Sequence, residues 1–157
     1  MKILCIDTAT SNCSAAISLN GQIMAEKTIS DSHANSSKLT VIIDDLLKEQ
    51  KIDIKSIDAV AINKGPGSYT GLRIGTSTAK GICYAIGKPL IAIGSLEAMA
   101  WAFNSANGTS TAILCPMIDA RRMEVYTALF DNKMQQIAQV EAKIINQNSI
   151  ADALEHS

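Results

Sequence analysis

The stretch IDTATSNCSAAISLNGQIM, residues 6–24, decides the organisation of this chain because its pattern returns farther along the sequence. An apolar run ends in Asp7, and a short loop, an alternating run and a turn at Asn20 follow. A frame shifted by 112 residues places Asp119 on Asp7 and Asn132 on Asn20 without a gap. Repeated patterns of this kind indicate repeated structural modules. They predict two lobes, with a cleft between the two loops that carry the aspartates.

The first copy is expected to open an alternating α/β module. Apolar residues at positions 39, 42, 43, 46 and 47 recur with the period of an amphipathic helix. Asn20-Gly21, between two short strand-like runs, is a strong hairpin signal. Strands and helices that alternate argue for parallel strands joined by crossover helices. The expected elements are strands at 3–6, 14–19 and 22–29, a helix at 34–50, a strand at 59–62, a helix at 70–86, a strand at 90–93 and a helix at 95–103.

A polar stretch, residues 104–110, is predicted to separate the two lobes. Residues 1–105 then form a complete first lobe of order βββαβαβα, and residues 106–157 form a shorter second lobe. Because Ser157 corresponds only to Asp45 of the first copy, we expect the second lobe to be incomplete. Its expected elements are strands at 111–118, 124–130 and 134–140 and a helix from about residue 149.

The composition is typical of a folded domain that buries a core, since the 157 residues are 47% hydrophobic and 18% charged with a formal net charge of −1. No run of Lys and Arg exceeds Arg121-Arg122, so direct nucleic-acid binding by the chain alone is not expected. No stretch is apolar over the length of a membrane span. The cysteines lack CxxC spacing, which predicts free, buried thiols in the reducing cytoplasm. They are Cys5, Cys13, Cys83 and Cys115.

The glycine-rich stretch GPGSYTG, residues 65–71, lies between an expected strand and an expected helix. Backbone N–H groups at the start of a helix can bind an anion. A Walker-type phosphate loop needs Lys directly after its second Gly, whereas Leu72 follows Gly71. The spacing therefore favours a structural turn, in which Gly65, Gly67 and Gly71 fix the start of the helix and let another chain approach closely.

The two Asp-bearing loops are candidates for a degenerate nucleotide site. A carboxylate with neighbouring hydroxyls suits Mg²⁺ and phosphate oxygens. The glycines usual in such loops are absent, because Ala9 and Ala120 occupy the corresponding places. The alternative is that Asp7 caps its own loop and that Asp119 pairs with one of the two following arginines, Arg121 or Arg122. The candidate nucleotide-site residues are Asp7, Thr8, Thr10 and Asp119.

The helix at 70–86 is suited to burial on two sides. At 100° per residue, small and apolar side chains share one stripe that would pack on the sheet. The opposite stripe carries no charge, and Arg73 and Lys80 fall together on one flank. Either the preceding helix covers the uncharged stripe, or the stripe is a protein interface of close-packed helices. The candidate interface residues are Ile74, Ser77, Thr78, Gly81 and Tyr84, with Val41 and Asp45 on the preceding helix.

Three motifs resemble those of the bacterial TsaB (YeaZ) family in the actin-like ATPase superfamily. They are IDTAT at 6–10, GPGSYTGLRIG at 65–75 and IDARRMEVY at 118–126. The resemblance covers nearly the whole chain, although position 123 has Met where the family usually has Gly. It implies an α/β fold of the actin-like ATPase (ribonuclease H-like) kind, with a second lobe shorter than that of the family.

The resemblance also implies a role as an accessory subunit rather than an enzyme. Family members pair, with themselves and with TsaD, through helices of the first lobe. TsaD transfers a threonylcarbamoyl group to N6 of adenosine 37 in transfer RNA, and TsaE, an ATPase, joins the assembly. The expected partners are TsaD and TsaE, with a homodimer in the absence of TsaD. ATP or ADP with Mg²⁺ is expected only in the complex.

Catalytic groups are scarce in this sequence. TsaD holds its metal with a His-x-x-x-His motif, whereas the fourth residue after His33 is Ser37, and the other histidine is His156. No metal site and no catalytic residue is therefore expected, and no G-x-S-x-G nucleophile elbow is present. One alternative is a small ATP-dependent kinase or hydrolase with a working cleft. A third and weaker alternative is the glycoprotease function named in an older label of the family.

Overall fold

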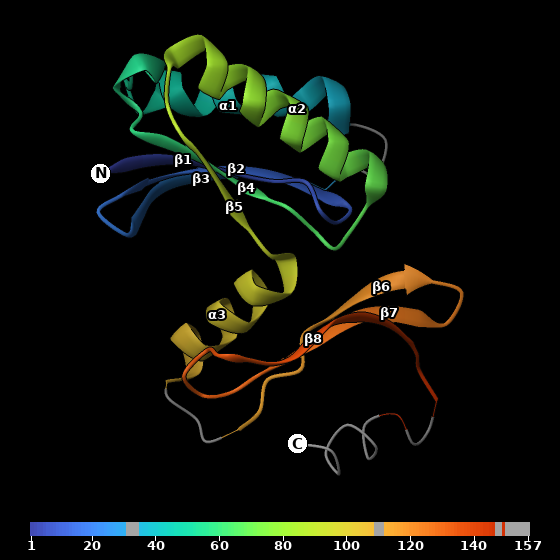
Figure 1. The fold of residues 1–157 in the computed structure, drawn as a ribbon. Coiled ribbons are helices and arrows are strands. Elements are labelled where there is room, and N and C mark those ends of the chain that lie inside the picture. Colours follow the sequence, from blue (N-terminus) through green and yellow to red (C-terminus); the bar gives the residue numbers. More distant parts are fainter. Residues whose placement is uncertain (31–34, 109–111, 147–148, 150–157) are drawn as a thin grey trace. The chain divides into compact units, whose positions relative to one another are not determined.

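The computed structural model describes residues 1–30, 35–108, 112–146 and 149 of the chain (Figure 1). The contacts divide the chain into two compact units, Met1–Ile93 and Gly94–Ser157, and each is described by itself. Within the described residues, the first unit holds a five-stranded sheet with two α-helices, and the second holds one α-helix with a three-stranded sheet.

The first unit is built on a mixed sheet with the strand order β3-β2-β1-β4-β5. The first three strands pair antiparallel, whereas β1, β4 and β5 run parallel. The strands expected in this part of the chain are confirmed, with ends that shift by no more than two residues. They are β1 (Lys2–Asp7), β2 (Asn12–Leu19), β3 (Gln22–Ser30), β4 (Ala59–Asn63) and β5 (Leu90–Ile93).

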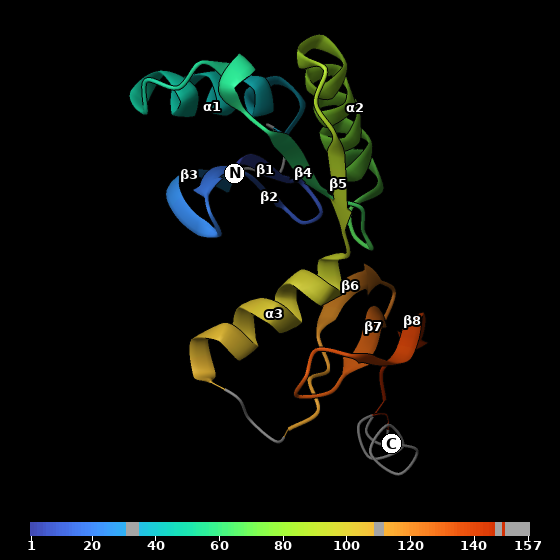
Figure 2. The same ribbon diagram turned by 60° about the vertical axis from the view of Figure 1, so that its left-hand side comes forward.

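Two helices, α1 (Asn35–Glu49) and α2 (Tyr69–Ile86), lie side by side on one face of this sheet (Figures 1 and 2). Their apolar stripes face the strands, so that Leu39 and Leu46 of α1 and Ala79 of α2 are completely or almost completely buried. A short 3₁₀ turn, η1 (Ile54–Ser56), precedes β4. No helix among the described residues has the length and apolarity needed to cross a membrane.

The turn between β2 and β3 has the predicted hairpin geometry. Leu19 pairs with Gln22, so only Asn20 and Gly21 form the loop. Both have positive φ angles, 51° and 85°. Two-residue turns with positive φ match the right-handed twist of the flanking strands, and Asn-Gly suits them because these residues tolerate that backbone region.

The second unit packs one helix on a three-stranded antiparallel sheet. Leu96 and Ala100 of the helix are buried against Ala128 and Phe130 of the central strand. Figure 2 shows the helix beside the sheet. The elements are α3 (Ser95–Asn107), β6 (Met117–Arg121), β7 (Glu124–Phe130) and β8 (Gln136–Ile144), with the sheet order β6-β7-β8.

Three expectations for the region after residue 93 are corrected. The contacts place the division between Ile93 and Gly94 rather than at residue 105, because α3 packs on β7. The helix also runs to Asn107, into the stretch predicted as a polar linker. β6 begins at Met117 rather than at residue 111, since Pro116 has no N–H group for a strand ladder. The helix expected from about residue 149 lies outside the described residues, apart from Ser149 itself.

Candidate functional site

The loop after β1 is held by hydrogen bonds from its own polar side chains. Asp7 Oδ1 accepts a hydrogen bond from the Ala9 N–H at 2.8 Å. The Thr8 side chain is fully buried, and its hydroxyl donates to the Gly71 carbonyl of α2 at 2.7 Å. Thr10 stays exposed and accepts from the Asn12 N–H at 3.3 Å. Of the three candidate nucleotide-site residues in this loop, only Asp7 and Thr10 therefore face solvent.

The glycine loop provides the room for this contact. A Cβ on Gly71 would lie 2.0 Å from the Thr8 carbonyl oxygen, and one on Gly67 would lie 2.3 Å from the Ala9 carbonyl oxygen. Gly65 has a φ of +99°, and its N–H donates to Asn63 Oδ1 at 3.0 Å. The backbone that approaches Gly67 and Gly71 belongs to the β1–β2 loop of this chain, whereas Gly65 lies against the Leu72 side chain. The approach of another chain to this loop stays a prediction.

The first turn of α2 has few free N–H groups for an anion. The Ser68 N–H donates to the Ala9 carbonyl at 2.6 Å, and Ser68 Oγ caps the helix by accepting from the Gly71 N–H at 3.3 Å. The Leu72 N–H donates to the Ser68 carbonyl at 2.8 Å. Anion binding at a helix start depends on unsatisfied N–H groups. Two donors that could have held a phosphate are thus used within the fold.

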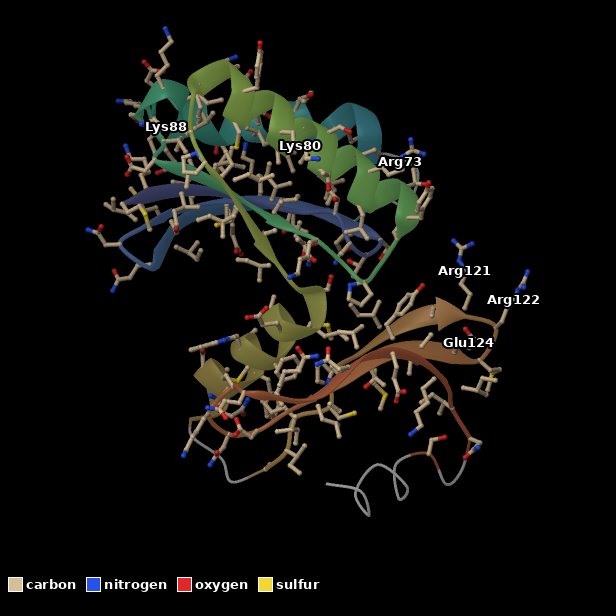
Figure 3. All side chains as sticks on the ribbon, in the orientation of Figure 1. Arg73, Lys80, Lys88, Arg121, Arg122 and Glu124 are labelled. Atoms are coloured by element: carbon tan, nitrogen blue, oxygen red, sulfur yellow. The ribbon has the colours of Figure 1, made fainter. Side chains whose placement is uncertain are left out.

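The loop that carries Asp119 repeats one detail of the Asp7 loop. Asp119 Oδ1 accepts from the Arg121 N–H at 2.7 Å, as Asp7 does from the residue two positions on. No ion pair joins Asp119 to Arg121 or Arg122 within the described residues. Figure 3 shows both arginine side chains extending outward from the β6–β7 turn. Since Asp7 and Asp119 belong to different units, the cleft between their loops stays a prediction.

The described part of the chain gives little support to a metal site or to a catalytic nucleophile. No group of three His, Cys, Asp or Glu side chains there is placed to hold a metal ion. His33 and His156 both lie outside the described residues.

The cysteines differ from one another in exposure. Burial raises the pKa of the Cys5, Cys13 and Cys83 thiols, which favours the neutral thiol over the nucleophilic thiolate. Cys115 is exposed, in contrast to the expectation that all four thiols are buried. Its Sγ lies 3.3 Å from Thr127 Oγ1. The reason for its exposure is that residue 115 precedes β6 rather than lying inside a strand.

The candidate interface residues all lie on α1 and α2 of the first unit. Ser77, Gly81 and Tyr84 are exposed, and Tyr84 reaches 92%. A Cβ on Gly81 would meet no atom within 4 Å. Ile74 and Thr78 are half-buried. The uncharged stripe of α2 is therefore largely open rather than covered by α1.

On α1, two further candidate interface residues lie at the surface. Val41 is 53% exposed, and the Asp45 side chain is 50% exposed with Lys27 Nζ at 3.9 Å. A groove of about 410 Å³ lies farther along, where residues of α1 and of the following turn face Ile82 of α2. Its edge carries the ion pair between Lys48 and Asp44, at 2.6 Å. The exposed surface of the two helices thus combines apolar, small and charged residues.

Comparisons with known proteins agree on one family. The family model described as "TsaD: tRNA N6-adenosine threonylcarbamoyltransferase" matches residues 22–154. The tRNA threonylcarbamoyladenosine biosynthesis protein TsaB of Bacillus subtilis is 33% identical over 157 residues, which cover 99% of this chain and 65% of that protein. The TsaB protein of Escherichia coli is 34% identical over 128 residues, covering 82% of this chain and 54% of that protein. The chain thus spans about half to two thirds of the length of these relatives.

A solved structure indicates the same family. YeaZ from Pseudomonas aeruginosa superposes with a TM-score of 0.83 at 26% identity, covering 93% of this chain and 68% of that one. Together with the family model, this confirms the actin-like ATPase fold expected from the order of strands and helices. The motifs, the fold and the matched relatives lead to one conclusion: the chain belongs to the TsaB (YeaZ) family, among the proteins that the TsaD model describes.

Proposed function

We propose that this chain is a non-catalytic subunit in the biosynthesis of threonylcarbamoyladenosine in tRNA, and that it works by pairing with TsaD. In this proposal TsaD transfers the threonylcarbamoyl group to the adenosine, and TsaE joins the assembly. The observation that carries the proposal is the open, uncharged stripe of α2, where Ser77, Gly81 and Tyr84 are exposed on a TsaB-like chain. In the absence of TsaD, the same stripe pairs two copies of this chain.

The shape of the stripe supports a protein partner. Gly81 leaves space above the helix axis, since a Cβ there would meet no atom within 4 Å. A helix of the partner can therefore come close, and Tyr84 offers a large ring beside that space. Tyrosine is among the residues that are enriched in energetically important contacts between proteins. Val41 and Asp45 extend the surface onto α1.

The state of the Asp7 loop and of the start of α2 supports the non-catalytic part. Thr8 is buried against α2, and the Ser68 and Gly71 N–H groups are bonded within the chain. Little remains here to orient a phosphate, a metal and an attacking group together. We therefore place ATP or ADP and Mg²⁺, if they take part, in the complex rather than on this chain alone.

Co-purification with TsaD tests the pairing. We expect a stable one-to-one complex with the wild-type chain and loss of that complex with Gly81→Arg, because a bulky charge would be buried without a partner at a cost of about 2–5 kcal/mol. Ser105→Arg on the exposed side of α3 is the matched control and should leave the complex intact. A wild-type chain that stays monomeric at high concentration and ignores TsaD would refute the proposal, as would Gly81→Arg that pairs unchanged.

An ATP hydrolysis assay tests the absence of catalysis. The purified chain should not hydrolyse ATP above background, since the Ser68 and Gly71 N–H groups at the start of α2 are bonded within the fold. Robust hydrolysis that Asp7→Ala abolishes would instead establish the alternative, a small kinase or hydrolase of the actin-like superfamily. Thr10→Ala, at the exposed end of the same loop, shows whether such a loss is specific to the carboxylate.

A further inference from the structure

The groove between α1 and α2 has an apolar interior and a charged mouth. Its volume is about 410 Å³, and Ile43 and Leu47 of α1, which line it, are buried. Ile52, Ile54 and Ile82 are half-buried and complete the apolar lining. The charged side chains that line the groove are exposed, at its mouth, and they are Asp44, Lys48 and Asp53. A groove of this kind suits a side chain with an apolar body and a polar end.

Tyr84 of α2 is a side chain of that kind. It is 92% exposed, so its ring lies almost entirely in water. Burying an aromatic side chain removes about 150–250 Å² from water, and a buried tyrosine hydroxyl usually finds a hydrogen-bond partner. Inside such a groove the ring would contact the isoleucine and leucine side chains. The hydroxyl would donate to a carboxylate at the mouth, where Asp44 and Asp53 can accept the bond.

Around α2, Gly81 lies between Tyr84 and the groove. At 100° per residue, Tyr84 points about 60° to one side of Gly81, and Ile82, which lines the groove, points about 100° to the other side. Along the helix axis, the three residues lie within about 5 Å of one another. Tyr84 therefore points away from the groove of its own copy, although it lies at nearly the same height.

A two-fold axis over Gly81 would bring the ring and the groove together. Such an axis reverses the direction of α2 and exchanges its two sides, so that Tyr84 of one copy lies on the groove side of the other copy. Gly81 allows the two helices to approach closely, because a Cβ there would meet no atom within 4 Å. In a symmetric pair the contact forms twice, since each copy offers both a ring and a groove.

The charges beside the ring and at the mouth of the groove also complement each other. Lys80 is exposed and lies one helical turn before Tyr84, on the same side of α2. It would accompany the ring to the other copy, where Asp44 and Asp53 lie at the mouth. Lys48, the cation of that mouth, is already paired with Asp44 at 2.6 Å. Opposite charges at the edge of a contact favour the correct register of the two copies.

We infer that the chain pairs with a second copy of itself by inserting Tyr84 of each copy into the groove between α1 and α2 of the other. The inference rests on the proposed function for the use of the α2 stripe in pairing, and it adds the contact that holds the pair. A second copy is the occupant because the chain itself supplies both parts, and because an axis over Gly81 brings them together. The hydroxyl donates to Asp44 or Asp53 of the other copy.

Sedimentation equilibrium of the full chain and two variants tests this contact. Tyr84→Ala removes the ring, and Thr40→Trp, at an exposed position that lines the groove, obstructs the mouth. Each variant alone should dimerise at least about 30-fold more weakly than wild type, the factor that corresponds to one strongly contributing side chain. An equimolar mixture, with one variant fluorescently labelled, should associate more tightly than either variant alone. The reason is that Tyr84 of the Thr40→Trp copy still meets the open groove of the Tyr84→Ala copy.

Tyr69→Ala is the matched control, since Tyr69 is a second exposed tyrosine on the same helix. α2 ends at Ile86, five residues after Gly81, so an antiparallel overlap centred on Gly81 begins about five residues before it. Tyr69 lies twelve residues before Gly81, outside this overlap. Its removal should therefore leave the dissociation constant within about threefold of wild type. Thermal unfolding checks that the three variants stay folded, as expected at exposed positions.

Three outcomes overturn the inference. They are a wild-type chain that stays monomeric at high concentration, dimerisation of Tyr84→Ala or of Thr40→Trp that equals that of wild type, and a mixture that associates no more tightly than the stronger of the two variants. The last would place Tyr84 elsewhere in the pair. Failure of the proposed function is seen separately, in the co-purification with TsaD. A chain that stays monomeric but binds TsaD overturns the Tyr84 contact and leaves the proposed subunit role in place.

Discussion

At the scale of single residues, the loop after β1 and the first turns of α2 are in contact backbone to backbone. The Thr8 carbonyl oxygen occupies the place of a side chain on Gly71, and Thr8 Oγ1 would lie 2.3 Å from a Cβ on Gly75. The hydroxyl also donates to the Gly71 carbonyl. Glycine is needed at positions 71 and 75 because of these contacts and not because of an unusual φ angle.

Gly71→Ala and Gly81→Ala should change stability in opposite directions. The first adds a methyl group where the Thr8 carbonyl lies, which should lower the free energy of unfolding by about 1–3 kcal/mol or more. The second adds the same group to the same helix in open space, and should raise it by about 0.5–1 kcal/mol because Ala favours a helix over Gly. Urea denaturation midpoints measure both. Equal shifts of the two midpoints would contradict the close approach of the Thr8 carbonyl to Gly71.

The sequence indicates a close approach at this site but not its partner. Gly71 and Gly75 lie one turn apart, and that spacing is a signal for contact with another backbone. We assigned the contact to another chain and assigned Thr8 to a nucleotide site. A hydroxyl next to a carboxylate suits a phosphate, yet it equally suits a buried hydrogen bond to a helix carbonyl. Only the path of the β1–β2 loop decides between these two roles. That path depends on packing against residues that are distant in the sequence.

At the scale of elements, the β6–β7 hairpin turns on residues that lack glycine's freedom. Arg121, Arg122 and Met123 have φ angles of 71°, 55° and 66°. A side chain costs about 1–2 kcal/mol per residue in this left-handed region. The β2–β3 hairpin avoids part of that cost with Gly21. The two hairpins of the repeat thus differ in the residues that form their turns.

Met123→Gly should therefore stabilise the protein, by about 1 kcal/mol. Met123 is 74% exposed, so little packing is lost with its side chain. Thr28→Gly, at an exposed position of β3 that pairs with Ser14, is the control and should destabilise by about 0.5–1 kcal/mol. Thermal unfolding of the three proteins measures the difference. A lower melting temperature for Met123→Gly than for wild type would contradict this account of the turn.

The elements of the first unit could be predicted because their hydrophobic patterns are regular. The five apolar positions of α1 recur with a helical period, and β4 is a short apolar run whose residues are all buried. After residue 104 the local signals are weaker. Ala, Ser and Asn in residues 104–107 are compatible with both a loop and a helix, and the structure continues α3 through them. Leu114 makes only an isolated bridge to Phe130, where a full strand was expected.

At the scale of the whole chain, the two units differ in how well their sheets are covered. All five residues of β4 are buried between neighbouring strands and under α2. In the second unit, β8 exposes Ile137, Val140 and Ile144 at 48–63%. It also lies at the edge of its sheet, with no strand beyond it among the described residues. Exposed apolar side chains on an edge strand favour local opening or pairing with another chain.

Hydrogen exchange should separate the two sheets. In a dilute monomer, we expect amides of Glu124–Phe130 to exchange faster than those of Ala59–Asn63, although both strands are central in their sheets. The reason is the thinner cover of the three-stranded sheet. Equal protection of the two strands would show that α3 alone is sufficient cover for the second unit.

The contact between Thr8 and α2 also links the Asp7 loop to the helix that carries the proposed protein interface. Because Thr8 lies close to the backbone of α2 and bonds to the Gly71 carbonyl, we expect a shift of α2 to move the Asp7 loop with it. A protein bound at Tyr84 and an ion or nucleotide bound at Asp7 would therefore contact two parts of the chain that move together. If each ligand prefers a particular position of α2, each must alter the affinity of the other by the same factor.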